Sequence, residues 1–234
     1  MKNKKYVFVT GVPGSRWGKV EQAIRRVTNV VDQSSWLPYL QDDPQNLTEH
    51  VHKFYGPFMQ HGDRFDNLHI MGPDAVIEEI DRAYDNSDPR PIRFVRCHWF
   101  AYQLDWIAEN LPEVDIMMMF REGTISLKWW LESGGWNIQY PCYKWYGDTE
   151  KLRRQIHIEN ECMLKFMREQ KLNQSYDVTT DGLKKFIHEY WPDIEEHIVN
   201  DKWPEFNIQD KSVWPVLYKG TASKPVNKYL LNQN

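Results

Sequence analysis

The sequence predicts an α/β protein with a mostly parallel central sheet and helices on both of its faces. Three short segments rich in β-branched or apolar residues, 6–10, 92–96 and 114–120, are each followed by apolar residues at helical spacing. Strands that alternate with helices along a chain are joined by right-handed crossovers, which produce a parallel sheet. With 234 residues and no evident internal repeat, the chain is expected to form one domain spanning residues 1–234.

The first of these units is a strand, a glycine-rich turn and a helix. The turn, residues 11–19, reads Gly-Val-Pro-Gly-Ser-Arg-Trp-Gly-Lys, and the helix after it is marked by Val20, Ala23, Ile24 and Val27. Such a turn directs backbone N–H groups and the positive end of the helix dipole to one point, where Arg16 and Lys19 add charge. The unit therefore predicts a phosphate or sulfate site, with an ordinary tight turn as the alternative.

The turn departs from the Walker pattern of nucleotide kinases. That pattern has four residues between its first glycine and the Gly-Lys pair, followed by a serine or threonine that binds magnesium. Here three residues separate Gly14 from Gly18, six separate Gly11 from Gly18, and Val20 follows Lys19. A valine side chain cannot bind a metal ion, so the sequence disfavours a magnesium-dependent kinase and keeps it as an alternative.

The rest of the chain continues the alternation. Residues 28–91 are polar and rich in turns, and only 75–84 has a helical pattern there. After the strand 92–96, a helix marked by Ala101, Leu104, Ile107, Ala108 and Leu111 is expected to end at Pro112. The run 114–120 is almost uninterruptedly apolar, which is typical of a parallel strand buried on both faces.

The C-terminal half is predicted to hold three more helices and one more strand. Thr124 is the expected N-cap of the helix that follows the strand 114–120. A long helix is expected over 149–171, a strand over 176–179, and a helix around 183–190 that ends at Trp191-Pro192.

Charge and hydropathy argue against nucleic acid and membrane partners. The net charge is −4 and the pI is near 6.1, so no general basic field attracts polyanions. The sequence has no apolar run approaching a membrane span of roughly 18 residues and no leader pattern, and a cytoplasmic protein is expected.

The cysteines and histidines are not spaced as the ligands of a metal site usually are. The cysteines Cys97, Cys142 and Cys162 are odd in number and widely separated, which predicts reduced thiols rather than disulfides or a thiolate zinc site. Four histidines of the segment 28–91 lack a carboxylate or thiolate at helical spacing: His50, His52, His61 and His69. No metal is therefore expected.

Aromatic residues make up 14% of the chain, and 11 residues are tryptophan. Core packing is the ordinary explanation. Several of these rings stand in polar stretches, where flat rings can also line a pocket for a purine or a sugar: Trp36, Trp136, Trp145 and Trp203.

Three turns that follow predicted strands, 11–19, 96–98 and 121–126, are expected to share one crevice at the carboxyl edge of the sheet. Together they resemble the sulfotransferase family, whose members bind 3′-phosphoadenosine 5′-phosphosulfate on a P-loop-like fold. The start of the first turn is similar to the family's 5′-phosphosulfate loop, which in one branch reads Gly-Val-Pro-Arg-Ser-Gly-Thr-Thr. The segment from Phe120-Arg121 through Ser126, together with Trp129-Trp130, resembles its 3′-phosphate motif. Arg96-Cys97-His98 resembles the Lys-Thr-His turn of cytosolic members, whose histidine is the general base.

The resemblance covers residues 5–27 and 92–132, and it implies a divergent sulfotransferase with a P-loop NTPase-like three-layer fold. It implies that His98 and Arg16 are catalytic. Gly14 stands where the family has a cation, so the cation would be Arg16 or Lys19, with Arg16 preferred; Tyr218-Lys219-Gly220 resembles the family's C-terminal Arg-Lys-Gly clamp. The expected donor-binding residues are Gly11, Val12, Pro13, Gly14, Ser15, Arg16, Trp17, Gly18, Lys19, Arg121, Ser126, Lys219 and Gly220.

The chemistry of these residues agrees with sulfuryl transfer to a hydroxyl or amine of a small-molecule acceptor. Such an acceptor reacts poorly until a base takes its proton, and an imidazole such as His98 can do so at neutral pH. Backbone N–H groups and a cation can stabilise the leaving phosphate without a metal. The alternative for His98 is a helix cap, and for Arg121 and Ser126 a surface ion pair and a first-turn hydroxyl.

Two other functions stay open at this point. One is a nucleotide or small-molecule kinase, because Glu122 lies close to the end of the strand 114–120. The other is a non-catalytic nucleotide-binding protein with the same fold. The acceptor would be chosen by residues 28–91 and 134–148, which have little pattern, and the oligomeric state is not predicted.

Overall fold

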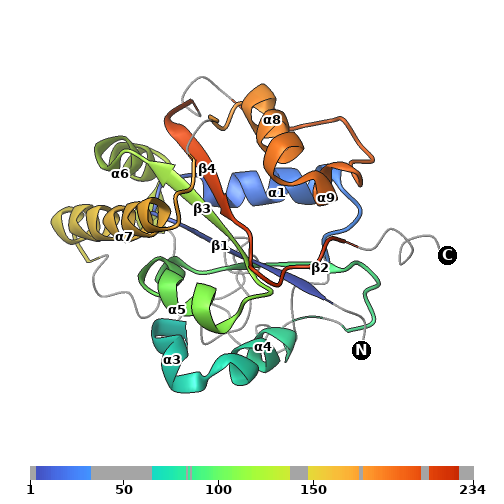
Figure 1. Ribbon diagram of the computed structural model, residues 1–234. Coiled ribbons are helices and arrows are strands. Elements are labelled where there is room, and N and C mark those ends of the chain that lie inside the picture. Colours follow the sequence, from blue (N-terminus) through green and yellow to red (C-terminus); the bar gives the residue numbers. More distant parts are fainter. Residues whose placement is uncertain are drawn as a thin grey trace.

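The computed structural model describes residues 4–32, 65–82, 84, 86–137, 147–173, 176–206 and 211–226. Within them a four-stranded mixed sheet has the strand order β2-β1-β3-β4. The strands β1 (Lys5–Gly11), β2 (Ile92–Arg96) and β3 (Asp115–Arg121) are parallel, and β4 (Val213–Tyr218) pairs with β3 in the antiparallel sense. The structure thus confirms an α/β protein with a mostly parallel sheet (Figure 1).

The described part of the chain contains eight α-helices and three short 3₁₀ helices. The α-helices are α1 (Trp17–Val27), α3 (Leu68–Met71), α4 (Pro73–Arg82), α5 (Leu104–Asn110), α6 (Gly123–Glu132), α7 (Thr149–Glu169), α8 (Thr180–Tyr190) and α9 (Pro192–Glu195). The 3₁₀ helices are η4 (Phe65–Asn67), η5 (His98–Tyr102) and η6 (Gly135–Asn137). The predicted helices around 20–27, 75–84, 149–171 and 183–190 are confirmed as α1, α4, α7 and α8.

Aromatic side chains cover both faces of the sheet. Successive strand residues point to opposite faces. On one face, Phe94 of β2 packs edge-on against Trp191, which lies between α8 and α9, with 5.7 Å between ring centroids. On the other face, Phe8 of β1 stacks on Phe100 of η5 at 4.5 Å. Every residue of β1, β2 and β3 is buried. Both faces of the sheet are therefore shielded from solvent.

Three local predictions are wrong. Residues 176–179 form no strand: Val178 donates one backbone hydrogen bond to Val213, and Thr179 is the N-cap of α8. The helix expected over 101–111 is divided into η5 and α5. The N-cap of α6 is Glu122 rather than Thr124, since the Glu122 carboxylate accepts hydrogen bonds from two first-turn N–H groups. The backbone bond from Thr124 is the main reason why the pKa of Glu122 is lowered.

Strand β4 is absent from the sequence predictions. Its sequence, Val-Trp-Pro-Val-Leu-Tyr, contains Pro215, and proline disfavours strands because it cannot donate to a ladder. The strand forms because β4 lies at the end of the four-strand order, where one side of its backbone needs no ladder partner.

No helix in the described ranges is long and apolar enough to cross a membrane. In the same ranges, no three histidine, cysteine, aspartate or glutamate side chains are grouped so that they could hold a metal ion. Cys97 and Cys162 are free thiols, and Cys142 lies outside the described residues.

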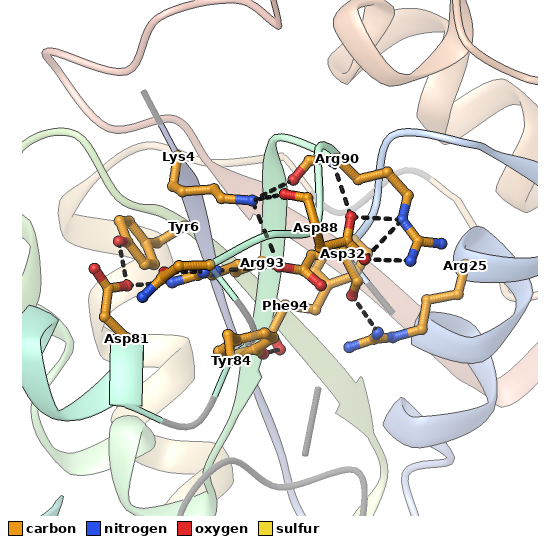
Figure 2. A network of polar contacts seen from close by, with 11 residues as sticks. Lys4, Tyr6, Arg25, Asp32, Asp81, Tyr84, Asp88, Arg90, Arg93 and Phe94 are labelled. Atoms are coloured by element: carbon orange, nitrogen blue, oxygen red, sulfur yellow. Dashed lines mark hydrogen bonds and ion pairs between the residues drawn. The ribbon is translucent and has the colours of Figure 1, made fainter. Parts of the chain in front are cut away.

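A network of ion pairs fixes the β2 side of the sheet (Figure 2). Its centre is Arg93, which is fully buried and pairs with Asp32 at 3.3 Å and with Asp81 of α4. Lys4 donates to the backbone carbonyls of Asp88 and Arg90 at 2.8 and 2.7 Å. Breaking a buried ion pair strongly destabilises a protein, because it leaves a charge without a partner. These pairs therefore hold the segments 28–32 and 86–91 against the strands.

Asp88 in this network should make the stability of the protein sensitive to acid. Burial raises the pKa of Asp88, but hydrogen bonds from the Arg90 side chain and backbone outweigh burial and hold this pKa at about 2. A lowered carboxyl pKa stabilises the folded state above the unfolded value of about 4, and this stabilisation is lost as the pH falls towards 2. Urea unfolding over this pH range should therefore show a smaller acid loss for Asp88→Asn than for the wild type. Asp74→Asn, at an exposed position of α4, should keep the wild-type pH dependence; equal curves for both variants would contradict this role.

Candidate functional site

The loop between β1 and α1 has the geometry of an anion cradle. Gly14 and Arg16 both have left-handed backbone conformations, with φ of 81° and 63°. The N–H of Ser15 donates to the Val12 carbonyl at 3.0 Å, and α1 begins directly afterwards at Trp17. Alternating left-handed residues before a helix N-terminus form a concave surface of N–H groups, which attracts anions.

The loop is fastened to the first turn of α6. A Cβ atom at Gly14 would lie 2.1 Å from the backbone oxygen of Ser126, so only glycine allows this approach. Arg121, at the end of β3, donates from Nη1 to the Gly14 carbonyl at 2.7 Å and from Nε to Ser212 Oγ at 3.0 Å. The structure thus brings the loop, Arg121 and Ser126 together, as the sequence predicts.

Arg121 and Ser126 contact the backbone of the loop and so hold it in place. Both side chains are buried, and neither lines the cavity described next. The buried Oγ atoms of Ser15 and Ser126 have no hydrogen-bond partner among the described residues. The 3′-phosphate contact expected of Arg121 and Ser126 stays a prediction.

A cavity of about 330 Å³ opens against the loop. Its walls combine loop backbone, basic side chains and indole rings, among them Arg16, Lys19, Arg96, His98, Trp129 and Trp130. No aspartate or glutamate from the described part of the chain lines it. The cavity is therefore electropositive and has flat apolar walls, a combination that suits a nucleotide or another aromatic anion.

Arg96 also lines this cavity, although it is not among the donor-binding residues expected from the sequence. It ends β2, it is 2% exposed, and its Nη1 lies 3.8 Å from Glu21 Oε2 of α1. A Cβ atom at Gly18 would lie 2.7 Å from this Nη1, so the guanidinium packs directly against the first turn of α1. The available signal was its place at the end of the predicted strand 92–96, two residues before His98.

The two predicted loop cations occupy different parts of the cavity wall. The guanidinium of Arg16 lies over the Trp129 ring, 5.0 Å from its centroid. Lys19 donates from Nζ to the Glu205 carbonyl at 3.1 Å and lies 4.6 Å from the centroid of Phe206. Arg16 is therefore the cation nearer to the tryptophan wall, and Lys19 is directed to the 205–206 segment.

His98 lies in this cavity at the end of the β2 unit. It is the first residue of η5, and its ring lies 4.5 Å from the Trp17 ring. Its Nδ1 atom lies 3.7 Å from Glu159 Oε2 of α7. The N-cap position of η5 belongs to Cys97 rather than to His98, which argues against the helix-cap alternative.

Lys219 and Gly220 are not brought to the loop. Because β4 is antiparallel to β3, the end of β4 lies beside the start of β3, whereas the loop follows the opposite end of β1. Lys219 Nζ pairs there with Asp115 at 3.2 Å and Asp193 at 3.3 Å, and the Gly220 N–H donates to Asp115 at 3.0 Å. The segment therefore lies at the opposite end of the sheet from the loop and is not brought to the loop cavity.

A second cavity, of about 570 Å³, lies between the start of α6 and α7. Its basic residues include Arg153, Arg154 and His157, but three glutamates line it as well: Glu122, Glu150 and Glu161. Its mixed charge makes it a poorer anion site than the loop cavity.

The structure describes only some of the remaining aromatic and histidine candidates. Trp136 packs edge-on against Trp130 at 4.7 Å and stands beside the loop cavity. Several others lie outside the described residues: Trp36, Trp145, His50, His52 and His61.

Comparison with known proteins identifies no relative of this chain. A scan against protein-family models, a search of curated proteins and a search of solved structures each found no significant match to this chain.

Proposed function

We propose that the protein is a sulfotransferase with a P-loop NTPase-like three-layer fold. It binds 3′-phosphoadenosine 5′-phosphosulfate in the loop cavity and transfers the sulfuryl group to a hydroxyl or amine of a small-molecule acceptor. The observation that carries the proposal is the loop cavity itself, where two arginines, a lysine and His98 meet without a carboxylate from the described residues in the wall.

The cavity suits both ends of such a donor. The N–H groups of the loop and the N-terminus of α1 would receive the phosphosulfate, with charge from Arg16 and Arg96. Trp129 and Trp130 offer flat surfaces on which a purine can stack. The volume of about 330 Å³ is at the lower end of the range found for small-molecule sites.

His98 would supply the base for the transfer. In the reacting complex, an imidazole nitrogen takes the proton of the acceptor hydroxyl while the acceptor oxygen forms a bond to sulfur. The bond between sulfur and the bridging phosphate oxygen breaks, and its electron pair stays on the phosphate. Arg16, Arg96 and the loop N–H groups stabilise this new charge, so the step needs no metal ion.

A second candidate function is nucleotide binding without transfer. It is favoured by the burial of His98, which is 2% exposed and has the Trp17 ring packed against it. The kinase alternative is less well supported, because magnesium in such enzymes is held by oxygen ligands, and no described aspartate or glutamate faces this cavity.

Ligand-induced stabilisation tests the proposal. Adenosine 3′,5′-bisphosphate at about a hundred times its dissociation constant should raise the free energy of unfolding by roughly 2.7 kcal/mol, or the melting temperature by about 5 to 10 °C, without magnesium. Arg16→Ala should reduce this shift, and Arg26→Ala, on the exposed face of the last turn of α1, should not.

The outcomes separate the candidates. Stabilisation by ATP with magnesium but not by the bisphosphate would favour a kinase. A melting curve that neither nucleotide shifts would overturn the proposal. Stabilisation by the bisphosphate, with no sulfate released from the donor to any acceptor tried, would favour the binding protein.

A further inference from the structure

A buried carboxylate stands behind His98. Glu159 of α7 is completely buried, and its Oε2 atom faces His98 Nδ1 at 3.7 Å. Glu159 occupies the apolar stripe of α7, between Ile156 and Met163, where a hydrophobic side chain is expected. A charged group in such a place destabilises the fold unless it is paired, so the position calls for a specific role.

The other oxygen of this carboxylate is held by its own helix. Gln155 donates from Nε2 to Glu159 Oε1 at 2.6 Å and also contacts the hydroxyl of Tyr102. Burial, and then the charge of Glu159, raise the pKa of Tyr102, so this hydroxyl stays neutral. Oε2 of Glu159 has no hydrogen-bond partner within the described ranges, and the His98 ring is placed to supply one.

We infer that Glu159 is the positioning residue of His98. Its carboxylate, oriented by Gln155, accepts the proton on His98 Nδ1 in a hydrogen bond and so fixes one tautomer of the ring. In that tautomer the other nitrogen, Nε2, carries a lone pair. The cavity wall formed by His98 then presents a proton acceptor, and Glu159 stabilises the imidazolium that forms when the proton arrives.

This inference rests on the proposed function only for the origin of the transferred proton. The tautomer of His98 is a property of the protein without ligands. It can therefore be measured whether or not the bisphosphate binds.

The test is ¹⁵N NMR of the imidazole groups at an alkaline pH at which histidine is neutral. The His98 signals are assigned as those missing from the His98→Asn variant. The wild type should show the Nδ1–H tautomer at His98. In Glu159→Gln, the new amide oxygen should keep the hydrogen bond from Gln155 and turn the NH₂ group towards His98, which should shift the ring to the Nε2–H tautomer.

Glu161→Gln is the matched control, because it removes the same charge from an exposed position of α7. It should leave the tautomer unchanged. An Nε2–H tautomer in the wild type would overturn the inference without any variant, and so would a Glu159→Gln spectrum identical to that of the wild type.

A parallel bisphosphate titration separates the two proposals. The expected tautomers together with an absence of bisphosphate binding would overturn the proposed function and leave the role of Glu159 intact. Bisphosphate binding together with an Nε2–H tautomer in the wild type would overturn the role of Glu159 and leave the proposed function intact. Where both hold, Glu159→Gln should lower turnover while its bisphosphate affinity stays at the wild-type level, a pattern that a merely structural role does not produce.

Discussion

Gly14→Ala is expected to destabilise the protein by about 4 kcal/mol, from backbone strain and overpacking together. The added Cβ atom would lie 2.1 Å from the backbone oxygen of Ser126, and Gly14 has a φ of 81°, which L-residues rarely adopt. Backbone atoms cannot move aside as a flexible side chain can, so the loop must lift away from α6. Urea unfolding measures the loss in stability, and any remaining folded protein should bind no bisphosphate.

Gly72→Ala is the matched control. Gly72 also has a positive φ, of 79°, but no atom lies within 4 Å of a Cβ atom built there. This variant should lose only the cost of backbone strain, about 1 to 3 kcal/mol, and keep its bisphosphate affinity. Equal losses of stability in the two variants would show that the contact between the loop and α6 is not made.

Arg96→Met is expected to weaken bisphosphate binding by about 10- to 150-fold, which corresponds to a charge-assisted contact of roughly 1.5 to 3 kcal/mol. Methionine fills much of the space of the arginine stem and removes the charge from the cavity. Glu21, the carboxylate behind Arg96, keeps its ion pair with Arg25, so the fold should survive. Isothermal titration calorimetry measures the affinity.

Arg25→Met provides the comparison, because Arg25 pairs with the same carboxylate and lies outside the cavity. It should reduce stability and leave bisphosphate affinity unchanged. An Arg96→Met protein that binds the bisphosphate as tightly as the wild type would remove Arg96 from the site.

The elements that sequence predicts well are those whose pattern is local. Each parallel strand is a short run of β-branched or apolar residues, and α1 and α8 carry apolar residues at a spacing of three and four. Strand β4 could not be found in this way, because its partner β3 is about a hundred positions earlier and Pro215 argues against a strand. The predicted N-cap of α6, Thr124, differs by two residues from the observed N-cap, Glu122. The side chains of both residues can accept hydrogen bonds from first-turn N–H groups, so the sequence pattern does not distinguish them.

The site residues that could be predicted are likewise those with a local sequence pattern. The glycine-rich loop, Arg121 and His98 follow strands directly, so the sheet edge that they share could be predicted from their order. Lys219 was assigned to the site only through the family resemblance, and the position of its segment depends on β4, which the sequence did not predict. Arg96 and Glu159 act through contacts with α1 and η5 that no local pattern specifies. Only Glu159 left a visible signal, as a charged residue in the apolar stripe of α7.

Amide chemical-shift mapping with ¹⁵N-labelled protein tests whether the loop cavity binds a nucleotide bisphosphate. Adenosine 3′,5′-bisphosphate, titrated without magnesium, should shift the backbone amides of residues 14–19 and the side-chain Nε–H of Arg96. These groups line or adjoin the cavity. Shifts centred instead on Arg153, Arg154 and His157, in the cavity between α6 and α7, or an unchanged spectrum, would contradict binding in the loop cavity.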